Sequence, residues 1–240
     1  TIVAVGAILL GYKLNGRNLA IFAGITMIYI SVFGQWKPSM QTLSFVMVAA
    51  PISFALGLAL GVWSYRSKKV EKILNPPLNV AQTMPHYSYL VPIMVLFGIG
   101  DHAGAIATII FATPPMVRLT ILGLRKVSPE VIEAGKMSGC NDFQLLIKVL
   151  IPTARRDILI GVNQVIMQCL AMAVIASFIG AKGLGWNLLL ALNQLRIGLA
   201  LECGVCITLI AVLLDKMSLA WANRQTNYFE NPTFFERNKY

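Results

Sequence analysis

The side chains best suited to polar chemistry gather in one stretch of an otherwise apolar chain, residues 128–152. This stretch reads SPEVIEAGKMSGCNDFQLLIKVLIP. Ser128 suits the cap that precedes a helix, Pro129 suits the first helical position, and Glu130 is favoured near a helix N-terminus. Gly139 can end the helix in a left-handed conformation. We therefore expect a short helix from Pro129 to just before Gly139.

A second short helix is expected in the same stretch. Asn141 or Asp142 can cap its start. Pro152 lacks the N–H that would continue the helical hydrogen bonds, so the helix should yield there. The pattern predicts a helix, a glycine turn and another helix.

The first of these helices could dock against another protein. Glu133 can accept a charge-assisted hydrogen bond from a partner's Arg or Lys. Apolar side chains can anchor such a contact, and small residues let a partner's backbone approach. The alternative is a plain connector between two spanning segments. The anchors are Val131, Ile132 and Met137, and the small residues are Ala134, Gly135, Ser138 and Gly139.

Residues that could hold a metal or perform redox chemistry are few. Cys203 and Cys206 form a C-x-x-C pair inside an apolar segment, with no His or further Cys nearby. We interpret all four Cys as small hydrophobic residues, and expect no disulfide, metal site or cofactor in this chain. No G-x-x-x-x-G-K-[ST] sequence occurs. We therefore expect a protein that is not an enzyme, with any ATP hydrolysis performed by a partner.

The composition indicates whether this chain is a soluble or a membrane protein. Of its 240 residues, 57% are hydrophobic and only 12% are charged, with a mean hydropathy of +0.70. An ordinary soluble domain has about 25% charged residues. The sequence therefore predicts an all-α, polytopic helical membrane protein, and the net charge of +10 does not indicate nucleic-acid binding.

Apolar runs predict about seven spans, with a loop around Lys182–Trp186. The fourth run contains Pro85 and Pro92, which predict a kinked helix. Thr1 is not an initiator Met, so we expect the natural chain to begin upstream. The runs cover about 1–12 (the end of a helix), 18–34, 40–63, 78–100, 103–124, 158–179 and 197–221.

The distribution of basic residues predicts the orientation. Of the 20 Lys and Arg residues, 17 fall on one side of the predicted topology. The positive-inside rule then places the loops at 64–75 and 125–157 and the C-terminus in the cytoplasm. We expect a multi-pass protein of the bacterial inner membrane.

The spacing within 128–152 resembles the EAA loop of the permease subunits of bacterial ABC importers. Glu133, Ala134 and Gly135 are followed by Gly139, and Pro152 comes thirteen residues later. Gly135 stands where that family has a second Ala. The resemblance implies that these five residues belong to a coupling helix that docks on an ATP-binding subunit.

Three further runs resemble the glycine betaine/proline betaine branch of these permeases. The resemblance implies a type I (MetI-like) transmembrane domain and a homodimer. It also implies a pair of ATP-binding subunits that use ATP and Mg, and an extracytoplasmic substrate-binding protein. The carried solute stays open among glycine betaine, proline betaine, choline, carnitine and trimethylamine N-oxide. The runs are residues 89–100, 115–123 and 171–185.

On this basis the chain divides into accessory spans at 1–37, a permease core at 38–222 with its coupling loop at 125–157, and a cytoplasmic tail at 223–240. Polar side chains within spans are candidates for the solute pathway because burying them in lipid is costly. The alternative is that they only bond neighbouring helices. The candidates are Asn163, Gln164, Met167, Gln168 and Ser177.

Two other functions are considered beside the ABC permease. An ion-coupled secondary transporter should show inverted repeats and acids within the membrane. We find no internal repeat and expect only Glu202 within a span. The other is a membrane assembly subunit that transports nothing. ATP-dependent uptake would distinguish the permease from both.

Overall fold

The computed structural model describes residues 2–230, and all regular secondary structure within them is helical, which confirms the all-α class. Two short segments differ from the α-helix: η1 is a π-helix and η2 is a 3₁₀-helix. The elements are α1 (Ile2–Asn15), α2 (Arg17–Val32), α3 (Trp36–Arg66), α4 (Lys68–Thr83), α5 (Tyr87–Phe97), α6 (Asp101–Arg125), α7 (Pro129–Met137), α8 (Asp142–Leu145), η1 (Leu146–Leu150), α9 (Ile151–Thr153), α10 (Arg155–Ile175), η2 (Ala176–Ile179), α11 (Leu184–Asn193) and α12 (Ile197–Glu230).

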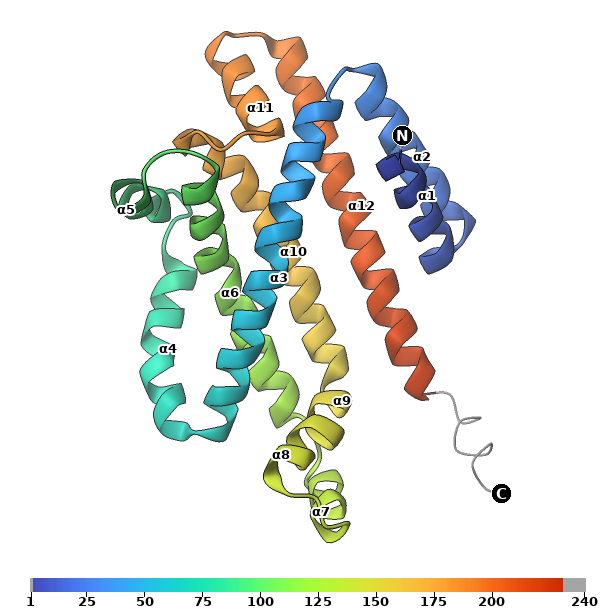
Figure 1. Cartoon of the computed structure of the whole chain (residues 1–240), viewed down its shortest axis with the longest axis vertical. Helices are drawn as coiled ribbons and strands as arrows, with labels where there is room; N and C mark the ends of the chain where they lie inside the picture. Colours follow the sequence, from blue (N-terminus) through green and yellow to red (C-terminus); the bar gives the residue numbers. More distant parts are fainter. Residues whose placement is uncertain (1, 231–240) are drawn as a thin grey trace.

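Four helical segments in the described part of the chain are long and apolar enough to cross a membrane. They are α3, α6, α10 with η2, and α12, which run side by side along the molecule (Figure 1). Helices α1, α2, α5 and α11 are apolar but shorter. The predicted count of about seven spans is therefore not confirmed. Helix α11 also begins at Leu184, inside the segment that we expected to be a loop.

The predicted span at 78–100 is wrong, because the chain breaks between α4 and α5. Met84 has an extended backbone with ψ of 136°. Pro85 follows it, and the proline ring disfavours a helical conformation for the preceding residue. Helix α5 consequently lies across the bundle and not along it (Figure 1).

Helix α6 is the centre of the packing, and α3 and α10 approach it through glycines. A Cβ on Gly57 of α3 would lie 2.5 Å from Cβ of Met116, and one on Gly161 of α10 would lie 2.7 Å from Sδ of the same Met116. One turn further along α3, a Cβ on Gly61 would lie 2.6 Å from Cβ of Thr120. Small residues at such positions let helices within a membrane pack closely.

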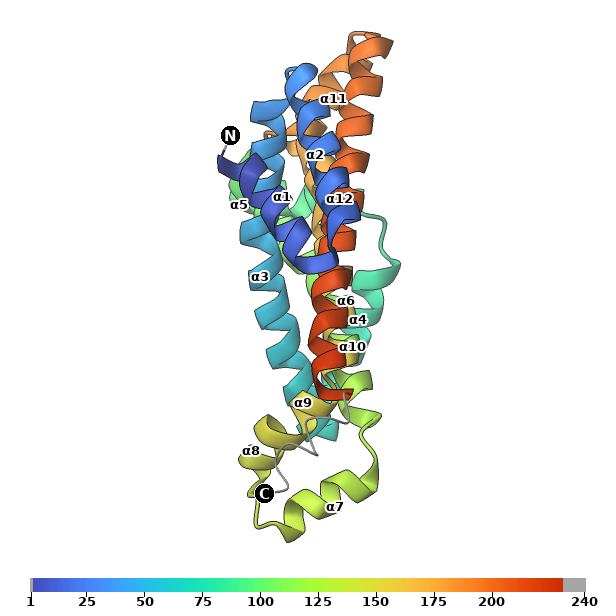
Figure 2. The same ribbon diagram turned by 90° about the vertical axis from the view of Figure 1, so that its right-hand side faces the viewer.

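The two ends of the bundle differ. The α3–α4 turn, helices α7 to α9 and the end of α12 lie together at one end (Figures 1 and 2). The α2–α3 turn and α11 lie at the other end. The loops that we predict to be cytoplasmic thus share one end of the molecule. Residues 223–230 of the predicted tail continue α12, and 231–240 lie outside the described residues.

We predict that Gly61→Leu destabilises the protein by about 1–3 kcal/mol, because the side chain would collide with Thr120 and separate α3 from α6. The measurement is thermal unfolding in detergent. Ala59→Leu, on the exposed face of the same helix, is the matched control and should unfold at the wild-type temperature. Equal unfolding temperatures for both variants would contradict the packing described above.

Candidate functional site: the polar loop and the cavity behind it

The first helix of the polar stretch forms as predicted. Helix α7 starts at Pro129, with Ser128 in an extended conformation at the N-cap position and Glu130 in the first turn. The Ser128 hydroxyl makes no capping hydrogen bond to the helix, so its backbone conformation alone marks the boundary. Helix α7 ends at Met137, and Gly139 has a left-handed φ of +80° that turns the chain back.

The second helix is capped at its N-terminus by two reciprocal hydrogen bonds. The Asn141 side chain accepts a hydrogen bond from the backbone N–H of Gln144 at 2.8 Å, and the Gln144 side chain accepts one from the backbone N–H of Asn141 at 3.1 Å. This reciprocal pair is a capping box. It confirms Asn141 as the start of the predicted second helix.

The second helix widens before it ends. Residues 146–150 form the π-turn η1, and the helix ends at Thr153. Pro152 has no N–H to donate to the carbonyl four residues earlier, and a π-turn is one way for a helix to absorb a missing bond. The helix therefore yields near Pro152, as predicted.

Gly135 faces the inside of the loop, which corrects the prediction that it lets a partner's backbone approach. It is the buried residue of α7. A Cβ on Gly135 would lie 2.6 Å from Cδ1 of Leu145 and 3.3 Å from Cγ2 of Val149. Ile132 also turns inward and packs against the main hydrophobic core. The glycine that departs from the EAA pattern thus lets α7 lie directly on α8 and η1.

The outward face of the loop carries a carboxylate among apolar side chains. Glu133 is exposed, and it has no hydrogen-bond or ion-pair partner among residues 2–230. Met137 is 90% exposed and Phe143 is 61% exposed. Phe143 and Ile147 are apolar residues at i, i+4 that our sequence analysis did not single out. Ala134, Ser138, Gly139 and Pro152 are exposed as well.

Two of the five candidate pathway residues line one cavity. Gln164 and Gln168 of α10 face a cavity of about 420 Å³ between α4, α6 and α10. Arg118 of α6 lines it too, and its guanidinium donates a hydrogen bond to the side-chain oxygen of Asn79. The other lining residues are Ala81, Gln82, Met84, His86, Phe111, Pro115 and Leu119.

The apolar part of the cavity wall is aromatic. The rings of His86 and Phe111 lie 4.3 Å apart between centroids, tilted by 48°. Tyr89 packs edge-on against Phe111 from outside the cavity lining, at 5.7 Å. The cavity lining thus contains amide and guanidinium donors as well as aromatic rings. Such a surface suits a small solute that has both a polar oxygen and a methylated nitrogen.

The other three candidates do not face this cavity. Met167 packs against the main core, and buried Ser177 donates a hydrogen bond to the backbone oxygen of Val174 at 2.7 Å. Asn163 donates to a carboxylate oxygen of Asp215 at 3.0 Å, and it accepts a hydrogen bond from the Ser218 hydroxyl.

The expectation that Glu202 is the only acidic residue within a span is wrong. Helix α12 carries Asp215 as well as Glu202. The signal was present in the sequence as an Asp after a run of aliphatic residues, but it lies beside Lys216 and resembles the start of a polar loop. In the structure Asp215 and Ser218 bond Asn163 across the α10–α12 contact. This polar cluster joins two spanning helices.

Residues 53–224 match the protein family described as the binding-protein-dependent transport system inner membrane component. The chain belongs to this family. It is therefore a multi-pass inner membrane protein and a transport component, and the predicted permease family is confirmed.

Relatives of known activity are transport permeases. The chain is 71% identical, over all of its length, to the trimethylamine N-oxide transport system permease protein TmoV of Pelagibacter ubique, and covers 33% of that protein. It is 50% identical over 96% of its length to TmoV of Ruegeria pomeroyi, covering 35% of it. It is 42% identical over 88% of its length to the glycine betaine/proline betaine permease ProW of Escherichia coli, covering 60% of it. The chain thus spans about a third of the length of the first two relatives.

Solved structures confirm the MetI-like fold. An inward-facing MetNI methionine ABC transporter matches 80% of this chain and 95% of its own, with a TM-score of 0.72 and 20% identity. An amino acid ABC transporter crystallised with histidines matches 85% of this chain and 96% of its own, with a TM-score of 0.63 and 20% identity.

We predict that Asn141→Ala raises the rate of hydrogen exchange at the start of α8, because the lost cap costs about 1 kcal/mol locally. The Gln144 amide, which the Asn141 side chain binds, should show the largest change. Ser128→Ala is the matched control at the other N-cap and should leave exchange in α7 unchanged, since that hydroxyl makes no capping bond. Faster exchange in α7 and none in α8 would contradict these assignments.

Proposed function

We propose that this chain is the membrane-spanning permease part of an ATP-driven importer for a small compatible solute, and that the polar loop couples it to a pair of ATP-binding subunits. The observation that carries the proposal is the shape of the loop. Helix α7 projects from one end of the bundle with Glu133 unpaired and Met137 and Phe143 exposed (Figure 2). The ATP and Mg would be used by those partner subunits, and this chain would perform no covalent chemistry.

The further partners follow the same proposal. Two copies of the permease would form the translocation path as a homodimer, and a substrate-binding protein would deliver the solute at the α11 end. The loop and the end of α12 would then face the cytoplasm. The charge distribution supports this orientation, since most Lys and Arg residues lie toward the loop end.

The contacts at the base of the loop explain how its movement could reach the cavity. Lys126, just after α6, forms an ion pair of 2.7 Å with Asp157 in the first turn of α10. Arg125 forms another of 2.6 Å with Glu71 of α4. The three helices that line the cavity are thus joined to one another beside the loop. A displacement of the loop would move the cavity walls together, as alternating access requires.

Within the cavity, Gln164, Gln168 and Arg118 would donate hydrogen bonds to the solute oxygen, while the Phe111 and His86 rings would contact its methylated nitrogen. The relatives with the highest identities reported above transport trimethylamine N-oxide, whose oxygen is a compact acceptor without a carboxylate. We propose trimethylamine N-oxide as the first solute to test and glycine betaine as the second.

We predict that Glu133→Leu and Gly139→Leu each lower ATP-dependent uptake by about tenfold, while the protein still inserts in the membrane. Glu133 would lose a charge-assisted hydrogen bond to the ATPase, and Gly139 would be strained by its positive φ. Uptake is measured in proteoliposomes that contain the whole transporter. Ala59→Leu, exposed on α3 away from the loop, the cavity and the α11 end, is the control.

Unchanged uptake in both loop variants would contradict a coupling role. If an ion gradient without ATP drove uptake by the wild-type protein, the ion-coupled secondary transporter would be favoured instead. Uptake of no tested solute under either condition would favour the assembly subunit.

We predict that replacing both Gln164 and Gln168 by Leu lowers uptake at least tenfold without changing the unfolding temperature, because these amides line the cavity and, within residues 2–230, make no hydrogen bond to another helix. Asn163→Leu on the same helix is the contrasting variant. It should lower the free energy of unfolding by about 1–3 kcal/mol, because the carboxylate of Asp215 on α12 loses its hydrogen-bond donor on α10. Normal uptake by the double variant would exclude the cavity as the route.

A further inference from the structure

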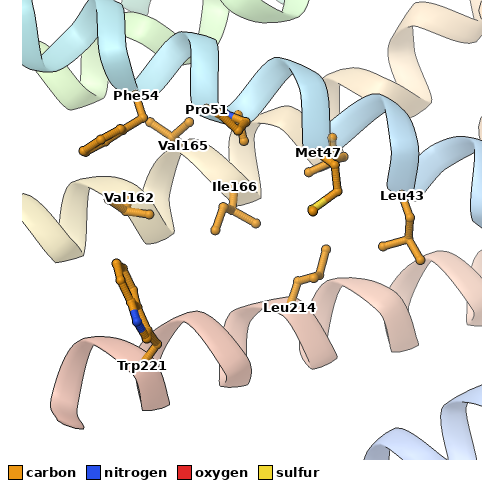
Figure 3. Close-up of a pocket in the computed structure, with 11 residues that line it drawn as sticks. Leu43, Met47, Pro51, Phe54, Val162, Val165, Ile166, Leu214 and Trp221 are labelled. Atoms are coloured by element: carbon orange, nitrogen blue, oxygen red, sulfur yellow. The ribbon is translucent and has the colours of Figure 1, made fainter. Parts of the chain in front are cut away.

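A second hollow in the molecule is apolar throughout. It is a groove of about 290 Å³ whose floor is α10 and whose walls are α3 and α12 (Figure 3). Phe54, Val162 and Trp221 lie at one end and Leu43 at the other, with Ile166 and Leu214 between them. We call this hollow the α3–α12 groove.

The α3–α12 groove faces away from the polar cavity. Val162 and Ile166, four residues apart, share the groove face of α10, whereas Gln164 and Gln168 face the cavity. A step of two residues along an α-helix turns the side chain by about 200°. The two hollows therefore lie on opposite sides of α10, and the groove is not part of the proposed solute route.

The length of the groove matches one leaflet of a bilayer. Leu43 and Phe54 are eleven residues apart on α3, which corresponds to a rise of about 16 Å. The hydrocarbon core of a bilayer is about 30 Å thick. Trp221 lies at one end of the groove, and Trp is enriched at the level of lipid headgroups.

The groove is too narrow for a helix. Its volume of about 290 Å³ is several times smaller than the volume of a helical segment of that length, which is about 10–12 Å wide with side chains, so the groove cannot enclose a helix. An unbranched hydrocarbon chain is the occupant that fits. This argues against a spanning segment of a second copy as the occupant.

Three exposed cations lie on or beside α12 near the level of Trp221, and two of them belong to the α1–α2 turn on the side of α12 away from α3 (Figure 1). Arg224 is exposed one turn beyond Trp221 on α12. The turn between α1 and α2, with exposed Lys13 and Arg17, lies against α12 (Figure 2). Its Leu14 belongs to the same hydrophobic cluster as Met217 and Ala220.

We propose that the α3–α12 groove binds one acyl chain of an anionic phospholipid, with the headgroup phosphate held by Arg224, Lys13 and Arg17. The chain would lie along Val162 and Ile166. Basic residues near the cytoplasmic end of spanning helices attract anionic headgroups, and the phosphate accepts charge-assisted hydrogen bonds from guanidinium groups. The site requires neither the solute nor the ATPase, so it can be tested independently of the proposed function.

The test uses Trp221 as the probe. The other three Trp residues of this chain are changed to Phe in the purified full-length permease, along with any Trp elsewhere in it. The protein is placed in phosphatidylcholine vesicles with rising fractions of phosphatidylglycerol brominated on its acyl chains. We expect saturable quenching of Trp221, half complete at a fraction about fivefold lower than with brominated phosphatidylcholine. A Leu56→Trp variant without other Trp residues, at a similar depth on another face of α3, should be quenched equally by both lipids.

Two further variants separate the headgroup from the chain. Arg224→Gln should reduce the preference for phosphatidylglycerol several-fold without disturbing the groove, whereas Arg66→Gln at the far end of α3 should not. Ala50→Phe should fill the groove and make the quenching of Trp221 non-saturable. The proposal is overturned if Trp221 is not quenched, because protein then covers the groove. It is also overturned if both lipids quench it equally, or if Arg224→Gln keeps the full preference.

Discussion

The close packing around Met116 is the contact on which the rest of the structure depends. Met116 of α6 lies between Gly57 of α3 and Gly161 of α10, where no Cβ would fit without a shift. Lipid offers no hydrophobic driving force between helices, so close packing of this kind must hold them together. Because α6 is held on both sides, the cavity wall that it forms and the loop that follows it have a fixed base.

Helix α10 separates two environments with different chemistry. One face supplies the amides of the polar cavity, and the opposite face supplies the floor of the apolar α3–α12 groove. Helix α10 is also joined to α12 by a polar contact inside the bundle, the hydrogen bond from Asn163 to Asp215. A helix with amides on one side and aliphatic residues on the other can thus border a polar solute route on one face and lipid on the opposite face. Its amides then stay out of the lipid.

The sequence was sufficient where local chemistry decides the structure. The start of α7 at Pro129, the cap at Asn141, the glycine turn at Gly139 and the interruption near Pro152 all lie where the residue types favour them. It was insufficient where distant residues meet. The inward position of Gly135 depends on Leu145, and the role of Asn163 depends on Asp215, some fifty residues away. The apolar run at 78–100 also predicted one span where the structure has the end of α4 and then α5. The sequence already contained the signal for this break, because Pro85 disfavours a helical backbone at Met84.

The π-turn at 146–150 has a geometric consequence for the whole loop. Such a turn holds one residue more than an α-turn, so every side chain after it is rotated by about 100° relative to an uninterrupted α-helix. The direction of the side chains between this turn and the helix end at Thr153, relative to the face that Leu145 presents to α7, is therefore set by the widened turn. A single surplus residue thus decides which side chains of residues 151–153 share the face of Leu145.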